Sequence, residues 1–140
     1  ELSTADEGVK LDAIMLGCPH FSYAEFQQLA QAIEAEGGRS LHPGLRIIVL
    51  TSQTSYALLQ RGNFMNTLLD FGIEIVLDTC VLHSPIISSD AEVIMTNSGK
   101  CAYYAPGELG VQVAFGSMRD CVRAAIEGAV CWGRTVWKGP

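Results

Sequence analysis

Hydrophobic and polar residues form two kinds of block along the chain. Short, nearly continuous apolar runs, which are typical of strands buried on both faces, occur at residues 11–16, 46–51, 73–80 and 92–98. Between them lie segments in which apolar residues recur every three or four positions, as on one face of a helix. Because strands and helices alternate in this way, the pattern predicts an α/β fold with a mainly parallel sheet of about four to five strands flanked by helices.

Three segments have the helical period. In 22–37 and 117–128 a serine is followed three residues later by an acidic residue, which is the capping-box pattern, and a glycine closes the segment. Residues 55–71 are also expected to be helical, with a break at Gly62 after which Asn63 caps a second helix. These segments are the helices expected to cover the sheet.

Length and composition are those of a single globular domain. The chain has 140 residues, of which 49% are hydrophobic and 17% charged, so a disordered chain is excluded and one α/β domain over residues 1–140 is expected. For its size the chain is rather apolar, which indicates that another domain or subunit covers part of its surface. The tail, 129–140, contains Trp132 and Trp137 and is expected to be an edge strand or an interdomain segment.

Charge and cysteine content narrow the possible environments and partners. The net charge is −6 with no basic run, so a nucleic-acid partner is not expected. No segment approaches the ~18 consecutive apolar residues of a membrane span, and the acidic N-terminus is not a signal peptide. Five cysteines without a tight pairing pattern then indicate reduced thiols or metal ligands in a cytoplasmic protein. Since the first residue is not Met, we expect a fragment of a longer chain.

Polar, chemically active residues follow all four apolar runs. In parallel α/β sheets, ligands bind at the carboxyl ends of the strands, so these residues should gather at one edge. They are Gly17-Cys18-Pro19-His20, Thr51-Ser52, Asp78-Thr79-Cys80 and Thr96-Asn97-Ser98-Gly99-Lys100. The NSGK segment is expected to be a turn whose amide, hydroxyl and ammonium donors suit a carboxylate or phosphate.

The remaining cysteines and histidines have simpler interpretations. Cysteine is among the most buried residue types, so packing is the favoured role for three of the five: Cys101, Cys121 and Cys131. His42 is typical of a turn, and His83 is ambiguous. A P-loop and a zinc ribbon are excluded because neither the G-x-x-x-x-G-K-[ST] spacing nor a C-x-x-C pair occurs. A Cys18 nucleophile activated by His20 stays open as an alternative.

Four segments, in this order, together resemble the aconitase X branch of the aconitase superfamily. They are LGCPHFSYAEF, DTC, MTNSGKCAYYAPGELGV and GSMRDCVRAAIEG, and they extend over nearly the whole chain. The resemblance is to the C-terminal part of the family's large catalytic portion, and it implies an aconitase-domain-like three-layer architecture. Aconitases carry a G-S-C-T-N-S-S-Y-E segment with a cluster-binding cysteine, and Cys18 has the same spacing to Ser22 and Tyr23. The chain departs from aconitases in lacking their C-x-x-C, since only Cys80 follows.

The resemblance implies an iron–sulfur-dependent hydro-lyase, a dehydratase that acts on a small hydroxylated carboxylic acid. The substrates known in this branch are cis-3-hydroxy-L-proline and, in archaeal members, mevalonate 5-phosphate. Cys18 and Cys80 would be ligands of a [2Fe–2S] or [4Fe–4S] cluster, whose third ligand comes from another part of the enzyme. With Lys100 as the one cation at the strand ends, the sequence slightly favours hydroxyproline.

Further roles follow from the same resemblance. His20 and Lys100 would be catalytic, with His20 orienting or protonating the departing hydroxyl. The groups that bind the substrate would be Ser22, Asn97, Ser98 and Lys100. The base would be a serine on a swivelling small domain or subunit, so that domain and the rest of the large subunit are the expected partners, and the chain alone would be inactive. A non-catalytic α/β interaction module is the alternative from a different functional class.

Overall fold

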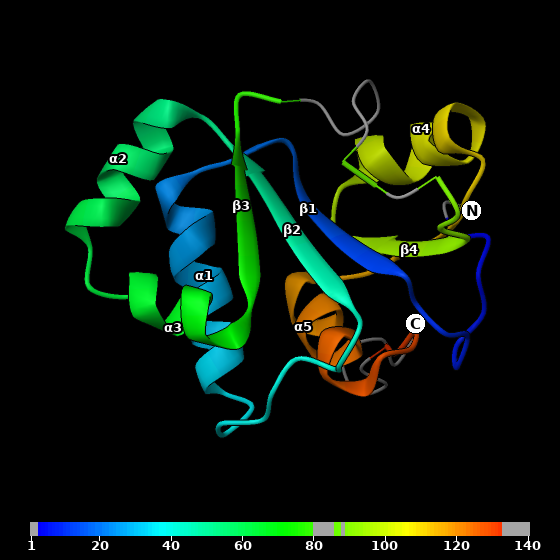
Figure 1. The fold of residues 1–140 in the computed structure, drawn as a ribbon, viewed down its shortest axis with the longest axis horizontal. Helices are drawn as coiled ribbons and strands as arrows, with labels where there is room; N and C mark the ends of the chain where they lie inside the picture. Colours follow the sequence, from blue (N-terminus) through cyan, green and yellow to red (C-terminus); the bar gives the residue numbers. More distant parts are fainter. Residues whose placement is uncertain (1–2, 80–85, 88, 133–140) are drawn as a thin grey trace, which may run out of the picture.

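The fold is built on a five-stranded parallel sheet (Figure 1). The computed structural model of the chain describes residues 3–79, 86–87 and 89–132, with the backbone alone at residues 18 and 19. The strands are β1 (Ala13–Phe21), β2 (Arg46–Thr51), β3 (Ile73–Leu77), β4 (Val93–Thr96) and β5 (Gln112–Phe115). Their order is β3-β2-β1-β4-β5, and every neighbouring pair is parallel.

Helices cover both faces of the sheet. They are α1 (Tyr23–Glu34), α2 (Gln53–Arg61), α3 (Met65–Phe71), α4 (Gly99–Leu109) and α5 (Met118–Glu127). Alternate strand residues point to opposite faces, so Ile14 and Ile47 pack under α1, α2, α3 and α5, whereas Met15 and Ile48 pack under α4. The predicted α/β class and the three-layer architecture are therefore confirmed.

Two helices begin where the capping patterns predict. Ser22 accepts a hydrogen bond from the Glu25 N–H while the Glu25 carboxylate accepts one from the Ser22 N–H, and Ser117 and Asp120 form the same reciprocal pair before α5. Each capping box satisfies backbone donors that the first turn of a helix leaves unpaired. α5 ends at Gly128 as predicted, whereas α1 already ends at Glu34.

The segment predicted as one broken helix is two helices, with the break at Gly62 as expected. α2 starts earlier than predicted, at Gln53, because the Ser52 hydroxyl accepts from the Ser55 N–H and caps it. The prediction that Asn63 caps the second helix is wrong. Phe64 occupies that position without a side-chain hydrogen bond, since its ring packs on the core and lies 5.4 Å from that of Tyr23.

α4 and β5 are absent from the sequence-based prediction. The NSGK segment, predicted as a turn, is the cap and first turn of α4, where the Ser98 hydroxyl accepts from the Cys101 N–H. Glycine and proline within the helix lower its intrinsic propensity, but Cys101, Ala102 and Ala105 are buried on the sheet and stabilise it.

The remaining strands and the tail also differ in part. The fifth strand is β5 rather than the tail, of which Ala129 forms an isolated antiparallel bridge with Lys10 and residues 133–140 lie outside the described residues. β3 is shorter than predicted and stops before Asp78, whose φ of 51° leaves the extended region. Within the described residues, no helix is long and apolar enough to cross a membrane.

Candidate active site

All strand carboxyl ends lie on one side of the sheet, which we call the carboxyl edge; the opposite side is the amino edge. Four helices begin at the carboxyl edge, each capped by a serine: Ser22, Ser52, Ser98 and Ser117. The N-terminal end of a helix presents unpaired N–H groups and partial positive charge, which favour an anion. This edge is therefore suited to a carboxylate or phosphate ligand.

The order of strands reverses between β1 and β4. The chain passes from β1 to β2 and β3 on one side, and then returns to β4 and β5 on the other. In parallel sheets a crevice opens at such a reversal. Met15 of β1 is paired with Thr96 of β4, so the segments that follow these residues leave the sheet from neighbouring strands. The structure thus brings Gly17–His20 and Asn97–Lys100 to the same part of the carboxyl edge.

Gly17–His20 do not follow β1, as the sequence predicts, but form a bulge within it. Leu16 is paired with Val49 and Phe21 with Thr51, so five residue steps of β1 lie opposite two of β2. Gly17 has φ +84°, and a Cβ at this position would overlap the Leu50 carbonyl oxygen. The bulge therefore requires glycine at its first residue. His20, at its end, is exposed.

At the end of β4, a chain of hydrogen bonds shapes the start of α4. The buried Thr96 hydroxyl accepts from the Ser98 N–H at 3.1 Å, and the Ser98 hydroxyl accepts from the Cys101 N–H at 3.1 Å. Asn97 is half-buried, and Lys100 is exposed in the first turn. Lys100 forms no ion pair with any other residue that the structure describes. Its ammonium group is thus placed to receive an anionic ligand.

The ends of β2 and β3 lie on the other side of β1. Thr51 is fully buried, and its hydroxyl donates to the Phe21 carbonyl at 2.7 Å. The Asp78 carboxylate accepts from the Gln53 N–H at 3.3 Å, and the Thr79 hydroxyl donates to the Leu77 carbonyl at 2.8 Å. These groups support the backbone. Cys80 and His83 lie outside the described residues, so a pairing of Cys18 with Cys80 stays a prediction.

The remaining cysteines differ in burial. Cys101 and Cys121 are fully buried among apolar side chains, which confirms their packing role. Burial and the nearby Asp120 raise the pKa of the Cys121 thiol far above its ordinary value. Burial also raises the pKa of the half-buried Cys131. The burial of Cys101 and Cys121 therefore leaves neither thiol open to a metal ion.

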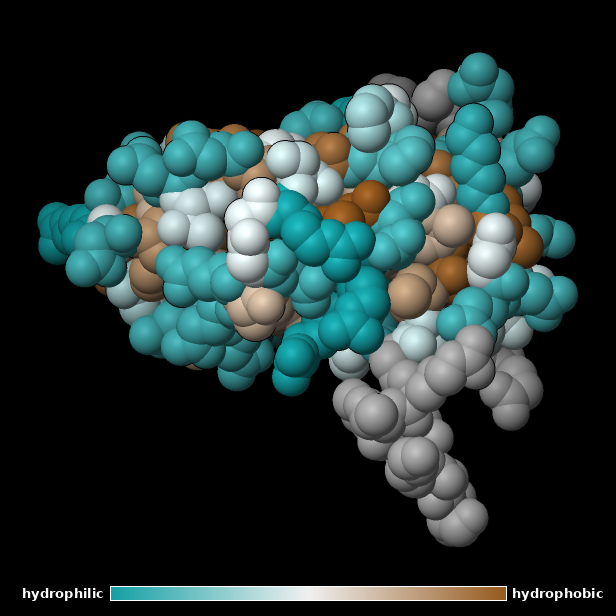
Figure 2. All heavy atoms as spheres, turned by 90° about the horizontal axis from the view of Figure 1, so that it is seen from below, coloured by the Kyte–Doolittle hydropathy of each residue, from teal (hydrophilic) through white to brown (hydrophobic). Residues whose placement is uncertain are grey.

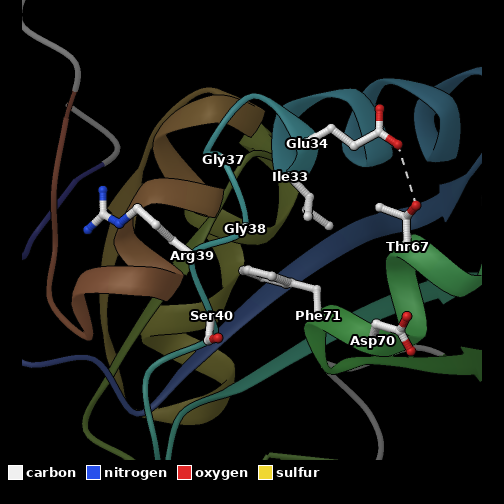
Figure 3. A pocket seen from close by; sticks show the side chains of 9 residues that line it. All are labelled: Ile33, Glu34, Gly37, Gly38, Arg39, Ser40, Thr67, Asp70 and Phe71. Atoms are coloured by element: carbon white, nitrogen blue, oxygen red, sulfur yellow. Dashed lines mark hydrogen bonds between the residues drawn. The ribbon is translucent and has the colours of Figure 1, made fainter.

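Two surface pockets lie at the amino edge, away from the predicted site residues. One, of about 480 Å³, lies where α1 ends beside α3, with Phe71 in its wall and Glu34 accepting from the Thr67 hydroxyl (Figure 3). The other, of about 470 Å³, lies beside the starts of β4 and β5. Figure 2 views the molecule from this side and shows mainly polar side chains around a few apolar ones. Neither pocket includes a residue for which the sequence indicates chemistry.

Comparison with known proteins identifies the family of this chain. Residues 11–127 match the family described as "Aconitase X third domain". The chain belongs to the aconitase X family. Among its relatives are the cis-3-hydroxy-L-proline dehydratase of Pseudomonas aeruginosa, 39% identical over 139 residues, and the phosphomevalonate dehydratase large subunit of Methanosarcina mazei, 32% identical over 123 residues. These matches cover 98% and 87% of this chain, but 23% and 29% of the relatives.

A solved aconitase X structure has the same fold. The crystal structure of Thermococcus kodakaraensis aconitase X in its holo-form superposes with a TM-score of 0.73 at 27% identity, over 83% of this chain and 29% of that one. This aconitase X chain therefore spans about a quarter of the length of the relatives it matches. The match confirms the resemblance found in the sequence.

The described residues supply an incomplete ligand set for an iron–sulfur cluster. Among them, no group of three or more His, Cys, Asp or Glu side chains is arranged to hold a metal ion. The backbone of Cys18 lies in the bulge at the carboxyl edge, whereas the thiols of Cys101 and Cys121 are fully buried. The described residues of this aconitase X chain thus form no complete cluster site, and Cys18 and Cys80 stay the predicted ligands.

The structure also adds two residues that the sequence reasoning did not select. The sequence marks Thr51 only as a polar strand end, although a threonine that closes an apolar strand can indicate a buried hydroxyl. Arg119 is exposed in the first turn of α5, on the face of the sheet opposite to α4. Its position two residues after the Ser117 cap could have indicated a second cation at the carboxyl edge.

Proposed function

We propose that this chain is the third domain of an iron–sulfur-dependent hydro-lyase that acts on a small hydroxylated carboxylic acid. The observation that carries the proposal is the match, along nearly the whole chain, to both a hydroxyproline dehydratase and phosphomevalonate dehydratases. Both kinds of relative are named dehydratases, and the reaction that this name describes is the loss of water from a substrate. The position of the bulge at the strand reversal, beside the N-terminus of α4, supports it.

The preferred substrate in this proposal is cis-3-hydroxy-L-proline, with mevalonate 5-phosphate as the alternative. The hydroxyproline relative is the more similar, at 39% against 32% identity. A phosphate would call for a denser group of cations than a single carboxylate does. Of the described basic residues, Lys100 and Arg119 lie in first turns at the carboxyl edge, one on each face of the sheet, which suits the singly charged carboxylate.

Each site residue then has a chemical role. Cys18 and Cys80 would hold the cluster together with donors from the rest of the enzyme, and the cluster would supply a Lewis acid for the departing hydroxyl. His20, exposed on the bulge, would orient that hydroxyl or give it a proton. Lys100, Asn97 and Ser98 would bind the carboxylate at the start of α4, and Ser22, whose hydroxyl can still donate, would contact the substrate from α1.

The remaining parts of the reaction would come from outside this domain. The proton next to the carboxylate would be removed by a serine of a swivelling domain or subunit, and the rest of the large subunit would close the site. The exposure of His20 and Lys100 at an open edge is consistent with a site that other domains complete. The domain is thus proposed to act only within the assembled, cytoplasmic enzyme.

Anaerobic reconstitution of the complete protein with iron and sulfide tests the ligand assignment. Cys18→Ala and Cys80→Ala should each abolish the visible absorption and the bound iron, because a thiolate ligand is lost, whereas Cys131→Ala is the matched control and should keep both. The reconstituted protein should dehydrate cis-3-hydroxy-L-proline faster than mevalonate 5-phosphate. Full iron content in both Cys18→Ala and Cys80→Ala would contradict the assignment. A colourless, folded protein in which the thiols of Cys18 and Cys80 both titrate would favour the interaction module instead.

A further inference from the structure

The bulge that carries Cys18 and His20 is fixed at both ends by contacts with β2. At its start, Gly17 lies so close to the Leu50 carbonyl that no side chain fits. At its end, the Thr51 hydroxyl donates to the Phe21 carbonyl at 2.7 Å. Between these two points, three more residues of β1 than of β2 must be accommodated. The bulge is therefore a short loop held at two fixed ends.

Thr51 itself is held rigidly. It is fully buried at the end of β2, its backbone carbonyl accepts from the Asp78 N–H at 2.9 Å, and it is paired in register with both Phe21 and Leu77. A buried hydroxyl must find a partner, and the Phe21 carbonyl is the partner that the structure gives it. The hydrogen bond is thus a fixed feature of the sheet.

Phe21 transmits this constraint to the neighbouring helix. Its side chain is 1% exposed, and its ring meets that of Phe26 edge to face with centroids 5.2 Å apart. The next residue, Ser22, caps α1. The hydrogen bond from Thr51 therefore fixes the point at which the bulge ends and α1 begins, one residue after His20.

We propose that Thr51 is a positioning residue, whose hydroxyl holds the Gly17–His20 bulge in the conformation that presents Cys18 and His20 to the site. The inference rests on the proposed function for the roles of those two residues. The hold on the two ends of the bulge, which we call the clamp, rests on the register of β1 against β2, the buried Thr51 hydroxyl and the contact of Gly17 with Leu50. Thr51 would thereby act on the reaction without touching the substrate.

The test uses hydrogen exchange in the metal-free complete protein. Thr51→Val keeps the shape of the side chain but removes the donor, so exchange of the peptide 16–22 should accelerate about tenfold, as expected for one buried hydrogen bond. Thr51→Ser keeps the hydroxyl and should restore the wild-type rate. Ile47→Val, a fully buried position in the same strand, controls for general destabilisation and should leave this peptide unchanged. Unchanged exchange in Thr51→Val would overturn the proposal.

A second measurement connects the clamp to the cluster. After reconstitution, Thr51→Val should release iron to a chelator about tenfold faster than the wild type, while Thr51→Ser and Ile47→Val should release it at the wild-type rate. Faster exchange with unchanged iron release would overturn the positioning role. If the wild type binds no iron although Thr51→Val accelerates exchange, the proposed function fails and the clamp stands. Should Thr51→Val not fold, Thr51→Ala against Thr51→Ser makes the same comparison, because they differ in one oxygen.

Discussion

Charged side chains differ in their ion pairing between the two edges of the sheet. The ion pairs found between two described residues lie at the amino edge: Arg39 with Glu36 and Glu127, Arg123 with Glu36, and Arg46 with Glu74. At the carboxyl edge, Lys100 and Arg119 take part in none of these pairs. Cations at the amino edge are thus paired with carboxylates, whereas these two cations at the carboxyl edge pair with no other residue that the structure describes.

The two edges also differ in the surroundings of their glycines with positive φ. Glycines with positive φ at the amino edge, such as Gly37, Gly38 and Gly44, form open turns in which a Cβ would meet no atom within 4 Å. At the carboxyl edge, Gly17 has a similar φ but lies against the backbone of β2. Gly72 and Gly128, also at the amino edge, lie close to the side chains of Leu41 and His42 instead. Close contact with the backbone of another strand is thus found at Gly17 and at none of these five glycines.

The largest effect on stability is expected from a matched pair of glycine substitutions, Gly17→Ala and Gly44→Ala. Both residues have nearly the same φ, +84° and +83°, so each substitution costs about 1 kcal/mol for the left-handed conformation. Gly17→Ala must also displace Leu50, and we expect a total loss of about 3 kcal/mol. Urea unfolding of the two variants measures the difference. Equal losses would show that the close approach of β1 to β2 is easily relieved.

Lys100→Gln and Arg39→Gln test the contrast in charge. Lys100→Gln should lower kcat/KM for the hydroxy acid about a hundredfold, because a charged hydrogen bond to the carboxylate is lost, and should leave the melting temperature unchanged. Arg39→Gln should leave kcat/KM unchanged and lower the unfolding free energy by less than about 1 kcal/mol, since its ion pairs are exposed. Steady-state kinetics of the complete enzyme and thermal melting distinguish them. A loss of activity in Arg39→Gln alone would reverse the roles assigned to the two edges.

Local patterns predict much of the fold, because many of its elements have local causes. α1 and α5 follow from capping boxes, and β2 from its apolar run, since these signals lie within a few residues of the element. α4 was missed because Gly99, Pro106 and Gly107 lower its propensity, and its stability comes from burial on the sheet. β5 is harder to predict than the equally short β4, because only its two central residues are buried.

The sequence predicts which segments form the candidate site, but not the shape of the site. The sequence places His20 and Lys100 after the first and the fourth apolar run, and the strand order of the sheet brings their segments together. The bulge could not be predicted, because it is defined by the register of β1 against β2, residues some 30 positions apart. Register depends on long-range pairing rather than on a local pattern. The proposed role of Thr51 depends on that same pairing, so the sequence shows the residue and not the role.

Substitutions of two helix caps at the carboxyl edge distinguish an effect on stability from an effect on catalysis. Ser98→Ala and Ser117→Ala each remove a hydroxyl that accepts from a backbone N–H in the first turn, and each should lower the unfolding free energy by about 1 kcal/mol. Because α4 begins at the strand reversal, only Ser98→Ala should also lower kcat/KM, by about tenfold. Urea unfolding and steady-state kinetics give the two quantities. Equal kinetic losses in both variants would place the substrate at α5 as well as at α4.

The smallest expected effect concerns the amino-edge pair of Arg46 and Glu74. Two hydrogen bonds from the Arg46 guanidinium lower the pKa of the Glu74 carboxyl below its ordinary value near 4.5. The pair therefore stabilises the fold above that ordinary pKa, and its contribution is lost as the pH falls through the lower folded-state pKa. Both side chains are 44% exposed, so the contribution is under about 1 kcal/mol. Urea unfolding should show Glu74→Gln less stable than the wild type at pH 7, and the difference should shrink as the pH falls below 4.5. A difference that does not change with pH would mean that the pair acts through packing rather than charge.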